Sequence, residues 1–80
     1  MEQKTGSLQA ERIEPVVAAT IAAHTDRVQE WIANRPGAWG YLAGQAVLSC
    51  RRELGRGLDE NERRLVWSIL WQRLLELRRE

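Results

Sequence analysis

The sequence predicts an all-α protein, a small bundle of three to four helices, and three observations support this prediction. Apolar residues recur at spacings of three and four along most of the chain, as they do on one face of a helix. No segment alternates apolar and polar residues in the manner of a strand. Proline, glycine and a capping motif separate the apolar segments. We therefore divide the 80 residues into a flexible N-terminal tail, 1–8, and a single helical domain, 9–80.

The first helix is predicted to begin near Pro15, because proline is favoured at the first helical position. An alternative is that the helix begins before Pro15 and kinks there. The second helix carries Val28, Trp31 and Ile32, and Thr25 or Asp26 is expected to cap its start.

The third helix is predicted over residues 37–54 and ends at Gly55, since glycine is the usual residue just past a helix C-terminus. The fourth is predicted over residues 60–77. Its start is marked by Asp59 and, three residues later, Glu62, which together have the spacing of a capping box.

Large rings suit the core of a small protein, and the chain has four tryptophans. We expect Trp31, Trp39 and one of Trp67 and Trp71 to fill the core. The residues predicted to share one core are Trp31, Trp39, Leu42 and Leu70.

Composition excludes several classes of protein. Twelve basic residues stand against eleven acidic ones, so the net charge of +1 gives no overall attraction to nucleic acid or membrane. The single His24 and the single Cys50 lie far apart in sequence, and we expect no metal site. There is no phosphate-binding glycine motif and no apolar stretch of membrane-spanning length. We therefore expect a cytoplasmic protein that is not an enzyme and uses no cofactor.

Gly40 and Gly44 stand inside the predicted third helix, where each interior glycine costs about 1 kcal/mol relative to alanine. Two interpretations remain open. The glycines could let a neighbouring helix of the same chain pack closely, or they could let a ligand such as RNA approach the backbone.

The arginines concentrate around the predicted turn between the third and fourth helices, where Gly55 and Gly57 leave the backbone accessible. Guanidinium groups suit phosphates, which makes this turn a candidate RNA-binding site, whereas acidic neighbours such as Asp59 allow a solvated turn of ion pairs. The candidate RNA-binding residues are Arg51, Arg52, Arg56, Arg63 and Arg64.

The fourth helix is apolar on more than one face, because Trp67, Trp71 and Leu75 flank the stripe of Leu70 and Leu74. Either the other helices surround it, or part of it is exposed for a partner. The candidate partner interface is therefore Trp67, Trp71 and Leu75, for a second copy or for another protein.

Residues 20–47 carry a family resemblance, at Ile21-Ala22, at Val28 with Trp31, and in the sequence AWGYLAGQAV of residues 38–47. This segment resembles the C-terminal tail of the B subunit of the tRNA-dependent Asp/Glu amidotransferase, a motif shared with small YqeY-like proteins. The matching core is Gly-aromatic-Leu-x-Gly-Gln, from Gly40 through Gly44 to Gln45, and the lysine that usually follows in the family is Leu48 here. The resemblance implies a helical fold and a contact with tRNA, and we expect Gln45 to form a hydrogen bond between packed helices.

Two hypotheses follow from the sequence. In the first, the chain is a small non-enzymatic module that contacts tRNA or other structured RNA through its arginines. In the second, it is a protein-interaction adaptor or a homodimer that docks through its tryptophan-rich last helix.

Overall fold

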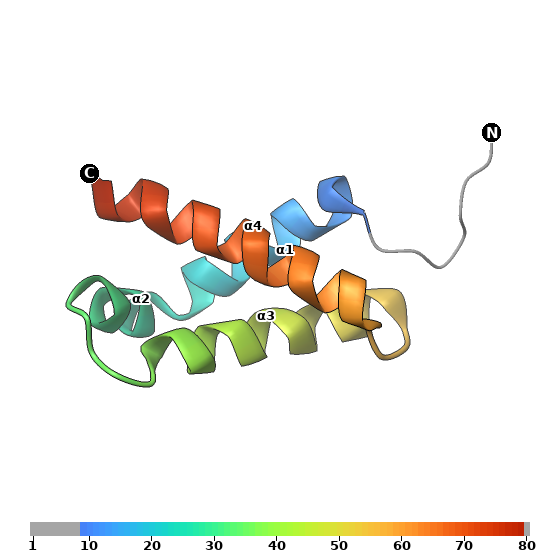
Figure 1. The fold of residues 1–80 in the computed structure, drawn as a ribbon, viewed down its shortest axis with the longest axis horizontal. Coiled ribbons are helices and arrows are strands. Elements are labelled where there is room, and N and C mark those ends of the chain that lie inside the picture. Colours follow the sequence, from blue (N-terminus) through green and yellow to red (C-terminus); the bar gives the residue numbers. More distant parts are fainter. Residues whose placement is uncertain (1–8, 80) are drawn as a thin grey trace.

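The computed structural model describes residues 9–79, and every regular element within this range is an α-helix (Figure 1). The helices are α1 (Ala10–Ala23), α2 (Thr25–Ile32), α3 (Ala38–Leu54) and α4 (Glu60–Arg79). The predicted all-α bundle is confirmed, while the predicted tail lies outside the described residues.

α3 packs against each of the other three helices, and α1 also packs against α4. In Figure 1, α4 crosses in front of α1, α3 runs below them in the opposite direction, and α2 lies near the C-terminal end of α4. The long helices therefore enclose a core, and one flank of the α3–α4 pair has no helix packed over it.

The core draws residues from all four helices. Trp31, Leu42 and Leu70 are buried as predicted, whereas Trp39 is only half-buried and packs against the core from its edge. Cys50 is fully buried, and desolvation, with a smaller contribution from Glu53, raises the pKa of its thiol to about 11. The thiol is therefore protonated at neutral pH. The fully buried large side chains are Ile13, Val17, Leu42, Cys50, Val66, Leu70 and Leu74.

α1 begins at Ala10, so the prediction of a start near Pro15 is wrong, and the alternative of a start before Pro15 is confirmed. Pro15 lies inside the helix and is exposed to solvent. Its missing N–H costs one helical hydrogen bond, but Ile13 and Val17, on either side of it, are both fully buried on one face. Burial of these two side chains outweighs the local cost of the proline.

α2 begins one residue after His24, and neither Thr25 nor Asp26 caps it, contrary to the prediction. His24 occupies the N-cap position, and its backbone N–H donates to the carbonyl of Ile21 at 3.2 Å. Its Nδ1 lies 3.0 Å from the carbonyl oxygen of Thr20. His24 thus bonds to carbonyl groups at the end of α1, and α2 begins without a side-chain cap.

Left-handed backbone conformations bound α3 on both sides. Gly37 (φ 87°) precedes it, and Gly55 (φ 81°) ends it with an N–H that donates to the carbonyl of Arg51 at 2.8 Å. Asn34 (φ 62°) turns the chain after α2. The predicted end of α3 at Leu54 and the predicted glycine cap are confirmed, and the helix begins one residue later than predicted, at Ala38.

Candidate functional site

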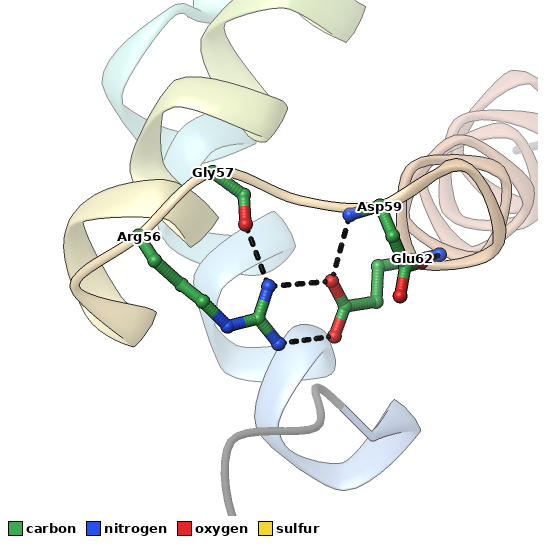
Figure 2. A network of polar contacts seen from close by, with 4 residues as sticks. All are labelled: Arg56, Gly57, Asp59 and Glu62. Atoms are coloured by element: carbon green, nitrogen blue, oxygen red, sulfur yellow. Dashed lines mark hydrogen bonds and ion pairs between the residues drawn. The ribbon is translucent and has the colours of Figure 1, made fainter.

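Arg56, at the turn between α3 and α4, is bound to Glu62 (Figure 2). Its Nη1 and Nη2 donate to Oε1 and Oε2 of Glu62 at 3.0 and 2.9 Å, and Nη1 also donates to the carbonyl of Gly57 at 2.6 Å. Hydrogen bonding to Glu62 is the main reason why the pKa of Arg56 is raised. The Arg56 guanidinium therefore holds the turn in place.

Glu62 is buried and completes the predicted capping box. Its backbone N–H donates to Oδ1 of Asp59 at 2.8 Å, and the backbone N–H of Asp59 donates to Oε1 of Glu62 at 2.9 Å. Both bonds satisfy N–H groups at the start of α4 that lack a helical partner. The same carboxylate thus serves the cap and the pair with Arg56 (Figure 2).

The five candidate arginines separate into three environments. Arg56 belongs to the turn, while Arg63 and Arg64 share the exposed carboxylate of Glu60, each at 3.3 Å. Arg51 and Arg52, exposed at the end of α3, form no ion pair with any other residue of 9–79. The structure therefore does not assemble the five into one cationic cluster.

Gly40 and Gly44 are exposed, so the interpretation that they admit a neighbouring helix of the same chain is wrong. A Cβ added at either position would meet no atom within 4 Å. The residues of α3 that face the other helices are instead Leu42, Ala46 and Cys50. The two glycines therefore incur their cost to the helix without any close contact within residues 9–79 that compensates for it.

Trp67 and Trp71 lie one turn apart on α4, and 38% and 41% of their surfaces are exposed. The prediction that one of them fills the core is therefore wrong. Trp71 instead covers the edge of the core, with its ring in edge-to-face contact with Trp31 and Trp39 at centroid distances of 5.4 Å. Trp67 makes no such ring pair in the described part of the chain, and the guanidinium of Arg63 lies 5.9 Å from its ring centroid.

Gly40, Gly44 and Trp67 border a groove between α3 and α4, which has a volume of about 370 Å³. Its lining is mostly apolar, and Arg63 is the charged residue that borders it. We call it the α3–α4 groove. Its lining residues are Trp39, Gly40, Ala43, Gly44, Val47, Arg63 and Trp67.

The sequence predicts separate roles for the residues that line this groove. It assigns close approach of a helix or ligand to Gly40 and Gly44, RNA binding to Arg63, a partner interface to Trp67, and a place in the core to Trp39. The other predicted interface residue, Leu75, packs against the core and borders a separate depression. The available signal for the groove is the set of small and apolar residues at helical spacing beside the buried face of α3, namely Gly40, Ala43, Gly44 and Val47.

Gln45 borders a wider groove between α1 and α3. Its side chain forms no hydrogen bond within residues 9–79, so the prediction of a bond between packed helices is wrong there. Arg12, Arg52, Glu11 and Glu53 also line this groove, so its charges balance.

Within the described residues, no three His, Cys, Asp or Glu side chains are placed to hold a metal ion. None of the described helices has the length and apolar character required to cross a membrane. Comparison of the chain with family models, curated proteins and solved structures finds no match in any of the three.

Substitution of Gly40 and Gly44 tests whether the space beside them on α3 is open. We expect Gly40→Ala and Gly44→Ala each to raise the free energy of unfolding by about 1 kcal/mol, because alanine favours the helix and its Cβ has free space. Urea unfolding measures the effect. Gly55→Ala is the control and should destabilise, since its φ is +81°. Destabilisation by Gly44→Ala would show a close contact there.

Proposed function

We propose that this chain is a non-enzymatic protein-interaction module that docks a partner in the α3–α4 groove. The observation that supports it most is the pair of glycines in the middle of α3, which face open space within residues 9–79. A helix without a docking role would be more stable with alanine at both positions. The exposed ring of Trp67 beside them supplies an aromatic anchor of the kind that concentrates binding energy at interfaces.

The test is an affinity capture from the native host with three forms of the protein. We expect the wild type and Ala22→Leu, a control that adds the same side chain at an exposed site on α1, to retain the same protein in stoichiometric amount. Gly40→Leu/Gly44→Leu should fill the groove and lose it, while remaining folded by circular dichroism. A partner retained equally by all three forms would contradict docking in this groove.

RNA contact is a second candidate function, supported by Arg51 and Arg52. Both are exposed, and within residues 9–79 neither has an ion-pair partner. Guanidinium groups in this state are available to phosphate oxygens. Arg56 is less suited to this role, because its removal would also disturb the turn that Glu62 holds.

If RNA binds, labelled tRNA should bind the wild type at low salt and weaken steeply as salt rises. Arg51→Ala/Arg52→Ala should flatten the log-log salt slope by about 1 for each phosphate group that the variant no longer binds. Arg78→Ala/Arg79→Ala, at the end of α4, removes the same charge elsewhere and should leave the slope unchanged. Absence of binding at low salt would exclude this function.

A further inference from the structure

We propose that the occupant of the α3–α4 groove is an acidic amphipathic helix of a partner protein. This inference rests on the proposed docking function and identifies the chemistry of the partner. The occupant would place an apolar stripe against the glycines and Trp67, and its carboxylates beside the arginines at the end of the groove nearest the α3–α4 turn.

The shape of the groove favours a helix. Gly40 and Gly44 lie one turn apart, and Trp39 and Trp67 border the same hollow. The distance between packed helix axes, usually about 8–10 Å, depends on the side chains at the contact, and glycines allow the short end of that range. A peptide that binds by adding a strand would need a strand edge to pair with, and residues 9–79 contain no strand.

The apolar surface continues along α3 beyond the groove. Leu48, four residues after Gly44 and therefore on the same face, is exposed. Arg51 follows Val47 by the same spacing and is also exposed. The face therefore changes from apolar to cationic toward the turn, as an amphipathic helix with acidic residues at one end would require.

The charges at this end have an excess of one sign. No carboxylate of residues 9–79 lines the groove, and its one charged lining residue is Arg63. Arg51 lies one turn after the lining residue Val47, and Arg64 is joined to Arg63 through Glu60. Asp59 and Glu60 are the exposed carboxylates at the start of α4, and Glu60 is paired with Arg63 and Arg64. Glu53 borders the opposite groove beside α1. Three guanidinium groups against two carboxylates leave this end with one excess positive charge, which an acidic segment would complement.

The same excess disfavours a second copy of the chain as the occupant. In a two-fold contact each copy presents the same surface, so two grooves facing each other would supply no carboxylate from their linings to the arginines of either copy. A partner with acidic side chains satisfies both the apolar and the charged parts of the surface.

The proposal can be tested with a displayed library of helical peptides on an alanine-rich frame. Contact positions vary among small and apolar residues, and flanking positions vary among Asp, Glu, Lys, Arg, Gln and Ser. Selection uses the wild-type protein, with depletion on Gly40→Leu/Gly44→Leu. We expect recovered peptides to share an apolar stripe and an excess of Asp and Glu at one end.

Charge reversal then locates the carboxylates. For a recovered peptide, Arg51→Glu/Arg63→Glu should weaken binding by about tenfold at low salt, and a peptide with lysines in place of its carboxylates should recover it. Because Arg63 is paired with Glu60, Arg51→Glu alone is a second variant that leaves that ion pair intact. Arg12→Glu, on α1, is the matched control and should leave the affinity unchanged.

The outcomes separate the two proposals. Peptides that need the glycines but show no preference for carboxylates, or no response to charge reversal, would overturn the acidic helix and leave the docking function standing. Failure to recover any glycine-dependent peptide would overturn both. A concentration-dependent dimer in sedimentation, or tRNA binding, that Gly40→Leu/Gly44→Leu abolishes would overturn the acidic helix in favour of a second copy or RNA.

Discussion

Trp31→Ala is expected to lower the free energy of unfolding by about 3 to 5 kcal/mol, a large part of the roughly 5–15 kcal/mol typical of a small domain. Trp31 is 7% exposed, and with Val28 it provides the buried surface of α2. Its ring also supports Trp71, which in turn contacts Trp39. Without Trp31, α2 loses most of its attachment, and the edge of the core opens to water.

Chemical unfolding followed by circular dichroism measures this loss. Trp67→Ala is the matched control, because Trp67 is 38% exposed and lies outside the ring cluster, and it should cost clearly less stability than Trp31→Ala. Similar losses for the two variants would mean that Trp31 does not anchor the core. The same control variant should weaken partner docking, which separates the two roles of tryptophan in this molecule.

Glu62→Ala is expected to cost about 2 kcal/mol from the charge-assisted hydrogen bond to the Asp59 N–H alone. The loss of the ion pair with Arg56 adds to this cost, because the guanidinium then loses its hydrogen bonds to the two carboxylate oxygens of Glu62. The start of α4 should fray, and hydrogen exchange of its first amides should become faster.

Glu62→Gln separates the two roles of the carboxylate. Glutamine can still accept the Asp59 N–H, so the capping box persists, but the ion pair with Arg56 is lost. We expect a smaller loss of stability than for Glu62→Ala. The difference in stability between the wild type and Glu62→Gln should also shrink as added salt screens the ion pair. Equal losses for both variants would assign the stability to the ion pair and not to the cap.

The elements that could be predicted from the sequence depend on local chemistry. The capping box at Asp59 and Glu62 needs only two residues three positions apart, and the cap at Gly55 needs only a left-handed conformation that glycine accepts. The start of α1 could not be predicted this way. There, burial of Ile13 against residues distant in sequence decided against the local preference of Pro15.

The α3–α4 groove could not be predicted from local sequence patterns either, because it depends on contacts between distant segments. The sequence shows that α3 has small residues at Gly40 and Gly44, but which side α1 and α4 cover depends on how the helices cross. The opposite charges of Arg56 and Glu62 are evident from the sequence, but whether the two side chains meet depends on the path of the turn between them. Only the assembled bundle shows that the glycines face outward beside Trp67.

The Arg56–Glu62 pair also bears on the order in which the chain folds. These residues are six positions apart, whereas the ion pair between Glu14 of α1 and Arg73 of α4 joins residues 59 positions apart. Closing a short loop costs less entropy, so the α3–α4 hairpin should form early and α1 should dock late. During synthesis α1 leaves the ribosome before α3 and α4, so its apolar face stays exposed until both of these helices can pack against it.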